Sequence, residues 1–436
     1  MTKLLLAFLL LPFLWISVFS ETASPSPTAS VSPNQQQALT QYQLPPERHQ
    51  QAHELNRIYF RHQLIVFVYT CLVLCLFLFS RLGARFRNFA KRVSGRLFLQ
   101  TIIFTPLLAL TLSLFELPAD SYMHRVSTRY GLSIQGWSSW FWDWTKSQLI
   151  TAIGATIFVL ILYAMIRRSR QRWWLYFWLA SLPIVLFLVF LQPLVLDPLF
   201  NKFGPLAEKD PGLASSLSRM AQHAGEDIPI DRMFWMDASV KTTTLNAYVT
   251  GFGSSKRIVV WDTTMQKLTT PEIVFVAGHE MGHYVLQHVP KGLAFAAIYS
   301  LAICYVGFLI FRWSIRRFGP RWDVHDVADI ASLPALLLVV SVLVFVSNPI
   351  VNAVGRYFEH QADQYALEIT HGLTPDSNQV CANTFQTLGT VGLSDPDPQP
   401  LNVFLFYDHP PIQDRFQFCL AYDPWSKGGS PSFINP

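Results

Sequence analysis

The sequence predicts an α-helical polytopic membrane protein with six spans, an N-terminal signal-like segment and a small α+β domain. Hydrophobic residues make up 51% of the 436 residues and charged residues only 14%, whereas soluble domains average about 25% charged residues. Six apolar runs are long enough to cross about 30 Å of hydrocarbon at about 1.5 Å per residue. The lipid bilayer is therefore an expected partner. The net charge of +5, without a basic stripe, argues against nucleic acid.

The chain begins with a segment typical of a secretory signal peptide or a first span, residues 1–20. Its apolar run, Leu4 to Phe19, is short for a span, which favours a cleaved signal. Residues 21–50 are expected to be a disordered linker, because Glu21–Gln37 is rich in Ser, Pro, Thr and Gln and shows no core-forming pattern.

Residues 51–199 are predicted to form a four-span membrane domain. Its apolar runs are His62–Ser80, Leu97–Phe115, Leu149–Ile166 and Trp173–Leu196. Tryptophans before the third run and at the start of the fourth are typical of a membrane interface. Two further runs, 292–311 and 330–351, fall within the segment 200–422, and residues 423–436 are left as a C-terminal tail. Any one run could be a buried core helix, but six runs in one chain favour membrane spans.

Basic residues indicate how the spans are oriented. Arginine and lysine crowd the three segments Arg81–Arg96, Arg167–Arg172 and Arg312–Arg321, which the positive-inside rule places in the cytoplasm. The segment 200–289 and the C-terminus then lie on the non-cytoplasmic side. Together with the signal-like start, this predicts a multi-pass protein of a bacterial inner membrane.

The segment before residue 270 carries the signals of a small mixed fold. Leu213–Ala224 is amphipathic and Arg232–Trp235 resembles a strand, while Leu245–Thr250 and Arg257–Trp261 flank a glycine-rich turn and predict a hairpin. The edge of such a strand can pair with an extended peptide. We therefore expect substrate contacts at Asn246 and Ala247, although a plain core hairpin explains these residues equally well.

A helix is predicted to follow over Thr269–His288. Thr269 or Thr270 can cap it, Pro271 suits its first position, and Glu272 complements the helix dipole.

This helix contains the motif His279-Glu280-x-x-His283. Residues four apart share a helix face, so both imidazoles can hold one Zn²⁺ at about 2.0–2.1 Å. Glu280 can then serve as the general base for a water molecule. The alternative is a surface helix with two solvated histidines. His288 lies five residues after His283, off the ligand face, and is interpreted as structural.

A catalytic zinc site needs a third protein ligand. Glu359 and Asp363 are four apart and follow the last apolar run directly. Two runs separate them from His283, so both motifs return to the same membrane face. We assign Glu359 as the third ligand and Asp363 as a partner that orients a ligand histidine or donates a proton. His360 and Glu368 remain alternatives to Glu359.

The five cysteines show no spacing typical of a disulfide framework or a metal knuckle. They are Cys71, Cys75, Cys304, Cys381 and Cys419. We interpret them as small apolar filler.

Several motifs together resemble the type I CAAX prenyl protease family of integral-membrane zinc metalloendopeptidases. They are His279-Glu280-Met281-Gly282-His283, Glu359-His360-Gln361-Ala362-Asp363, Asn246-Ala247-Tyr248, Lys256–Thr263, Pro198–Phe203, and Asp408-His409-Pro410-Pro411 followed by Arg415. The resemblance covers roughly residues 50–420.

The resemblance implies a helical membrane chamber closed by a zinc metallopeptidase domain, here residues 200–422, that hydrolyses peptide or membrane-protein substrates. It implies Glu280 as catalytic base, Asp363 as proton donor, and His409 and Arg415 as residues that reach the site and steady the transition state or grip a substrate carboxylate. Two other interpretations stay open: an envelope quality-control protease of damaged membrane proteins, and a non-catalytic zinc-containing binding protein. The sequence sets no oligomeric state.

Overall fold

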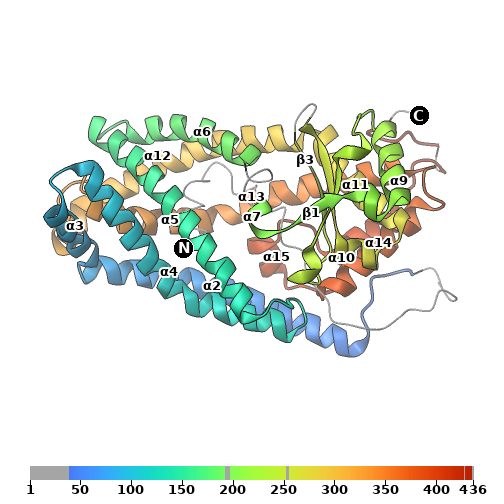
Figure 1. The fold of residues 1–436 in the computed structure, drawn as a ribbon, viewed down its shortest axis with the longest axis horizontal. Coiled ribbons are helices and arrows are strands. Elements are labelled where there is room, and N and C mark those ends of the chain that lie inside the picture. Colours follow the sequence, from blue (N-terminus) through green and yellow to red (C-terminus); the bar gives the residue numbers. More distant parts are fainter. Residues whose placement is uncertain (1–38, 192–196, 252–254, 427, 435–436) are drawn as a thin grey trace.

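A computed structural model describes residues 39–191, 197–251, 255–426 and 428–434. Figure 1 shows a bundle of long helices at one end and a small sheet flanked by shorter helices at the other. The predicted signal segment and residues 21–38 of the predicted linker lie outside the described residues. The expected class, a helical membrane protein with a small α+β domain, is confirmed.

The bundle consists of helices that carry the predicted apolar runs. Those long and apolar enough to span a membrane are α2 (Pro46–Phe79), α4 (Leu97–Arg129), α5 (Trp137–Arg168), α12 (His288–Trp322) and α13 (Leu333–Thr370). The fourth predicted run forms α6 (Trp173–Leu191), and its last residues, 192–196, lie outside the described part of the chain. The described residues therefore contain five candidate spans, whereas the sequence predicts six.

The helix α13 connects the two ends of the molecule. Its 38 residues extend over about 57 Å at about 1.5 Å per residue, which is well beyond the thickness of the hydrocarbon layer. One end packs in the bundle core, and the other lies against α11 (Thr270–Val285) beside the sheet. The same helix therefore spans the membrane and supplies residues beyond it.

The basic segment 81–96, between the first two predicted spans, contains the amphipathic helix α3 (Leu82–Val93). Its buried Arg87 donates to the Asp323 carboxylate at 2.8 Å and also pairs with Asp329. Both acids lie between α12 and α13, so this pairing ties α3 to the connection that follows the basic segment 312–321.

The sheet has four strands in the order β1-β2-β4-β3. They are β1 (Phe203–Pro205), β2 (Met233–Met236), β3 (Ala247–Thr250) and β4 (Arg257–Trp261). The strands β3 and β4 are antiparallel, as the predicted hairpin requires, and β2 runs parallel to β4. Because β3 is the last strand, one of its edges is not covered by another described strand.

Helices surround this sheet. Those before α11 are α7 (Asp197–Phe200), α8 (Leu206–Lys209), α9 (Pro211–His223) and α10 (Asp262–Lys267). Those after α13 are α14 (Ser377–Gly392), α15 (Pro400–Phe406) and α16 (Ile412–Ala421). The predicted amphipathic helix at 213–224 is confirmed as α9, whose buried Leu213 and Leu217 join the core beneath the sheet.

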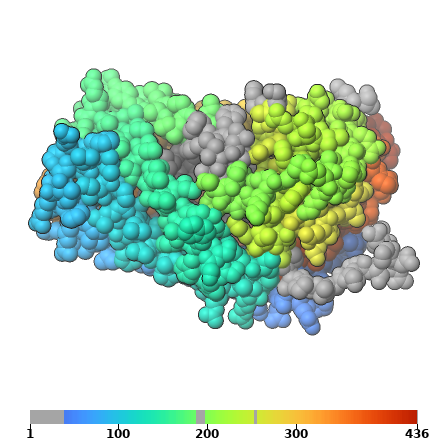
Figure 2. All heavy atoms as spheres, in the orientation of Figure 1, coloured from blue at the N-terminus to red at the C-terminus, as the bar shows by residue number. Residues whose placement is uncertain are grey.

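The sheet region packs against the ends of α4 and α5. Figure 2 shows the teal surface of these helices meeting the yellow-green surface of the sheet region. Lys241 Nζ lies 2.9 Å from the Asp143 carboxylate on α5, and a β-bridge pairs Ser133 with Thr242. These contacts fix the sheet region relative to the bundle.

The interpretation of the cysteines as apolar filler is wrong for two of them. Cys381 on α14 and Cys419 on α16 form a disulfide, with their Cα atoms 5.6 Å apart. They are 38 residues apart in the chain, and only the packing of α14 against α16 brings them together. Sequence spacing alone carries no signal of that packing.

Residues 39–50, the described part of the predicted disordered linker, are ordered, and described residues of the predicted tail pack on the domain. Within the predicted linker, Tyr42 is buried and donates from its hydroxyl to the Ser394 carbonyl at 3.0 Å, and α2 already begins at Pro46. In the predicted tail, the Phe433 backbone N–H donates to the Glu368 carboxylate at 2.7 Å. Apolar side chains in both segments pack on the domain core.

Candidate metal centre

The helix α11 begins as its sequence predicts. Thr269 is the N-cap residue, and its backbone N–H donates to the Glu272 carboxylate at 2.7 Å. This contact satisfies one of the N–H groups that a helix start leaves without an intrahelical partner. Farther along the same helix, His279 and His283 are both buried and contact Glu359 of α13.

Two glycines let α11 approach α13 closely. A Cβ atom on Gly278 would lie 3.1 Å from Ile369, and one on Gly282 would lie 3.1 Å from Tyr365 and 3.2 Å from the Ala362 backbone. Any side chain at these positions would push the two helices apart. The glycines that flank the first histidine therefore set the distance between the two motifs.

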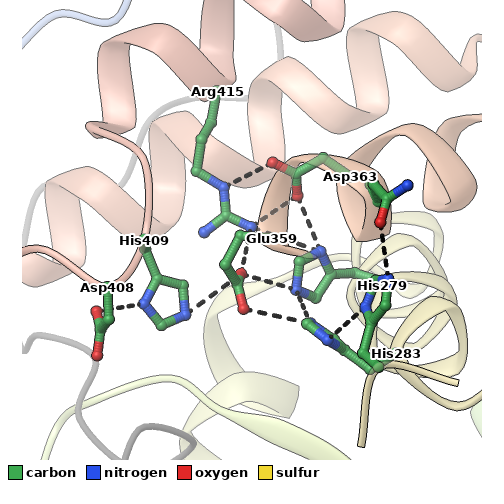
Figure 3. A network of polar contacts seen from close by, with 9 residues as sticks. His279, His283, Glu359, Asp363, Asp408, His409 and Arg415 are labelled. Atoms are coloured by element: carbon green, nitrogen blue, oxygen red, sulfur yellow. Dashed lines mark hydrogen bonds and ion pairs between the residues drawn. The ribbon is translucent and has the colours of Figure 1, made fainter. Parts of the chain in front are cut away.

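This packing brings His279, His283 and Glu359 together, with one potential ligand atom from each lying within 4.8 Å of the others. Glu359 Oε2 is 3.2 Å from His279 Nε2, and its Oε1 is 3.3 Å from His283 Nε2. Figure 3 shows the two imidazoles and the carboxylate converging on a common point. All three side chains are buried.

The arrangement of these atoms fits a divalent cation. The two Nε2 atoms are 3.1 Å apart, and His279 Nδ1 lies 2.9 Å from the Asp363 carboxylate, which only accepts hydrogen bonds when ionised. His279 therefore carries its proton on Nδ1 and directs a lone pair from Nε2 toward the other ligand atoms. Glu359 Oε2 is buried and accepts no hydrogen bond from the described residues. Two imidazole nitrogens and a carboxylate oxygen are a typical zinc donor set.

Asp363 is held on its other side by Arg415, which lies on α16. The guanidinium donates from Nε to Oδ2 at 2.8 Å and from Nη2 to Oδ1 at 2.6 Å. The same Nη2 lies 3.4 Å from Glu359 Oε2. The guanidinium also lies over the Phe385 ring, 4.4 Å from its centroid. The arginine thus binds the carboxylate that positions His279.

His409 reaches the site from the loop between α15 and α16. Its Nε2 lies 3.3 Å from Glu359 Oε2, and its Nδ1 lies 2.7 Å from the Asp408 carboxylate (Figure 3). Burial opposes protonation of this imidazole, but the Glu359 and Asp408 carboxylates raise the pKa of His409 above its ordinary value. The protonated ring donates from both nitrogens, so its Nε2–H points toward the place where the ligand atoms converge.

Glu280 is partly exposed and lies within electrostatic range of His279, His283 and His409. Burial raises the pKa of its carboxyl above the ordinary value for glutamate. A carboxylate with a raised pKa beside a metal site is suited to accept a proton.

Comparisons with known proteins agree with this geometry. Residues 207–422 match the model of peptidase family M48, and residues 31–202 match the model described as the CAAX prenyl protease N-terminal region with five membrane helices. A Bacillus subtilis protein named an uncharacterized metalloprotease, YhfN, is 43% identical over 320 residues, covering 73% of each chain. The chain belongs to the type I CAAX prenyl protease family of M48 peptidases.

More distant M48 relatives extend the similarity. CAAX prenyl protease 1 of Saccharomyces cerevisiae is 26% identical over 332 residues, covering 72% of this chain and 71% of its own. The crystal structure of S. mikatae Ste24p has the same fold, with a TM-score of 0.75 at 22% identity, and the match covers 97% of this chain and 98% of that one. Because the chain matches the M48 peptidases and a metalloprotease at 43% identity and contains helices that can span a membrane, it is a membrane-embedded metalloendopeptidase.

His360 and Glu368, the two alternatives to Glu359 as third ligand in this M48 peptidase, lie away from the group of potential ligands. His360 is exposed, with its ring 4.4 Å from that of Phe418. The Glu368 carboxylate accepts from Tyr422 and from the backbone of residues 432–434. Neither belongs to the group of potential ligands that includes Glu359.

His288, which the sequence placed off the ligand face, lies beside the second histidine. Its Nδ1 is 3.1 Å from His283 Nδ1. The prediction treated the helix as continuous through residue 288, but α11 ends at Val285 and α12 begins at His288. Helical spacing therefore does not apply across this turn.

The two predicted substrate residues lie at the start of the edge strand, which contacts α11. Asn246 precedes β3, and its backbone N–H donates to Thr264 Oγ1 at 2.7 Å. Ala247 is buried and pairs with Val260 of β4. A peptide at this strand would meet its backbone rather than the Ala247 side chain.

Proposed function

We propose that the peptidase is a zinc-dependent endopeptidase in which His279, His283 and Glu359 hold the ion and Glu280 is the general base. One observation carries the proposal: two Nε2 atoms and a buried carboxylate converge, with a second carboxylate next to the first ligand in the helix. Three protein ligands also leave a position for water, as in catalytic zinc sites and unlike closed structural sites.

In the proposed mechanism His279, His283 and Glu359 would hold the zinc ion, which would supply a Lewis acid for the scissile carbonyl and would lower the pKa of a water molecule from 15.7 to about 7. Glu280 accepts a proton from the attacking water and delivers it to the departing amine nitrogen, so that the C–N bond breaks and a C–O bond forms. His409 donates from its imidazole to the oxygen that becomes negative in the tetrahedral state.

Asp363 and Arg415 are assigned to positioning. Both Asp363 oxygens are bound by Arg415, and Oδ1 also lies next to His279 Nδ1, which favours orientation of the ligand over donation of a proton. Arg415 donates two hydrogen bonds to Asp363 and its Nη2 also lies 3.4 Å from Glu359 Oε2, so it acts on the site through these two carboxylates.

The peptide is proposed to bind along the outer edge of β3. The strand lies at the end of the sheet and contacts the helix that carries Glu280. An extended peptide that adds to this edge would lie across the metal site, held by backbone hydrogen bonds at residues 247–249, because the backbone N–H and carbonyl of Asn246 are already bound to Thr264 and Trp261.

Two independent features support a site on the non-cytoplasmic face, in a bacterial inner membrane. The basic segments lie at the end of the bundle where α3 is, opposite the sheet region (Figure 1). The disulfide between Cys381 and Cys419 lies in the sheet region, and disulfides persist in oxidising compartments outside the cytoplasm.

Replacing Glu280 with Gln tests the mechanism. We expect bound zinc to stay near one ion per chain while peptide cleavage falls by at least about 100-fold, the scale of general-base catalysis. Glu208→Gln, an exposed change on the same domain, is the control. Normal cleavage by Glu280→Gln would refute the assigned base, and a zinc-free wild type would refute the metal site.

The substrate is identified by comparing membranes that contain the wild type with membranes that contain Glu280→Gln. Several relatives are named CAAX prenyl proteases, so prenylated peptides ending in such a motif are the first candidates. Accumulation of misfolded membrane proteins in the variant would instead support envelope quality control. Unchanged proteomes together with inert peptides would favour the non-catalytic alternative.

A further inference from the structure

We propose that His288 and Gln361 fix the ring proton of His283 on Nδ1, so that its Nε2 presents a lone pair to the metal. The inference rests on the proposed zinc site and adds two positioning residues to it. Neither residue contacts the point where the ligand atoms converge, so both act through His283.

A sharp turn places His288 beside this ligand. The helix α11 ends at Val285, and Gln287 adopts the left-handed conformation with φ 58° and ψ 37°. The next helix therefore starts in a new direction, with His288 as its first residue. The imidazole of His288 is 2% exposed, so bulk water does not compete for its nitrogens.

The direction of each hydrogen bond follows from Gln361. Its amide oxygen, which can only accept, lies 3.3 Å from His288 Nε2. His288 therefore donates from Nε2, and a neutral imidazole then has only an acceptor left at Nδ1. His283 Nδ1, at 3.1 Å, must be the donor, which leaves His283 Nε2 unprotonated and facing Glu359.

Stacking on Phe358 holds His288 in position for its hydrogen bonds to His283 and Gln361. His288 lies parallel to the Phe358 ring, with centroids 4.4 Å apart and an interplanar angle of 4°. Gln361 and Phe358 both lie on α13, the helix that supplies Glu359. One helix thus provides the third ligand and the groups that orient His288.

The two ligand histidines consequently have different partners. His279 donates to a carboxylate, whereas His283 donates to a neutral imidazole. A carboxylate makes a ligand more basic, but it would add another negative charge to a buried site that already contains Glu359 and Asp363. A neutral acceptor fixes the tautomer without that cost.

Zinc affinity of the purified full chain in detergent tests the inference without measuring peptidase activity. We expect His288→Leu, which keeps an apolar group against Phe358, to weaken zinc binding by about 10–100-fold. His288→Asn, whose side-chain oxygen can replace the Nδ1 acceptor, should stay within a few-fold of the wild type. The affinity is read by competition with a chromophoric chelator, and the Co²⁺ absorption spectrum reports ligand geometry.

Substitutions of Gln361 test the hydrogen bond that this residue accepts from His288. Gln361→Glu keeps an acceptor for His288 and should bind zinc as well as the wild type, whereas Gln361→Met removes it and should weaken binding. His360→Leu, an exposed histidine on the same helix, is the matched control and should change nothing.

Equal zinc affinity for His288→Leu and the wild type would overturn the inference. So would an Asn variant as weak as the Leu variant, because that result would indicate packing rather than an acceptor at this position. A wild type that binds no zinc would refute the proposed function itself, which is a distinct outcome.

Discussion

At the residue scale, two carboxylates on one helix face have different surroundings. Glu359 and Asp363 are four residues apart, yet Glu359 faces the Nε2 atoms of both histidines and Asp363 faces Nδ1 of His279. The sequence places both acids on one face but does not say which ring nitrogen each one meets. The contacts therefore favour Glu359 as the ligand and Asp363 as its support.

Substitution of Glu359 tests its assignment as the third metal ligand. Glu359→Gln keeps the size of the side chain but removes its charge, so we expect zinc stoichiometry after dialysis to fall well below one ion per chain, because a carboxylate ligand is replaced by a weaker amide oxygen. His360→Asn should retain full stoichiometry. The opposite pattern, with zinc lost from the His360 variant alone, would make His360 the third ligand.

The group of potential metal ligands could largely be predicted because its signals are local. The spacing of His279 and His283 on one helix, and of Glu359 and Asp363 on another, predicts two shared faces. His409 and Arg415 were expected only from the family resemblance. The contact of His288 with His283 was not predicted, because nothing in the local sequence marks the left-handed turn at Gln287, where glycine is the usual residue.

At the element scale, the spacing of apolar residues predicted most of the helices and the main hairpin. The apolar runs form helices, and the β3–β4 hairpin and α9 lie where the pattern indicated. The three-residue strand β1 was not predicted, because it is too short to alternate and contains Gly204 and Pro205. The Cys381–Cys419 disulfide was missed because it depends on the contact between α14 and α16 rather than on any chain pattern.

The contact between α11 and α13 yields a second prediction. Gly282→Ala adds a Cβ about 3.1 Å from Tyr365, so the helices must separate and draw Glu359 away from the histidines. We expect a loss of thermal stability corresponding to about 1–3 kcal/mol, together with weaker zinc binding. Both are measured on the purified protein by thermal unfolding and chelator competition.

Gly154→Ala on α5 is the control for this change, because a Cβ there would meet nothing within 4 Å. It should leave stability and zinc affinity close to the wild-type values. If Gly282→Ala behaved like Gly154→Ala, the close approach of α11 and α13 would not set the ligand spacing.

At the scale of the whole molecule, α12 and α13 connect the two halves of the site through the bundle. The histidines precede α12 and Glu359 lies near the far end of α13, so the chain crosses the bundle twice between the two motifs. Two crossings return it to the same face, and this holds for either orientation in the membrane. The site can therefore assemble whichever side it faces, and the side must be tested separately.

Labelling with a membrane-impermeant maleimide decides the orientation. The free cysteines Cys71, Cys75 and Cys304 lie on α2 and α12 and are first replaced by alanine, whereas the Cys381–Cys419 pair is retained. In this background Glu208→Cys reports on the sheet region and Arg92→Cys on α3, and both positions are exposed. We expect the first to be labelled in intact spheroplasts and the second only after permeabilisation, because the basic segments lie inside. The reverse pattern would place the metal site in the cytoplasm. The disulfide would then have to survive among reducing thiols, which it would do only if it were inaccessible to them.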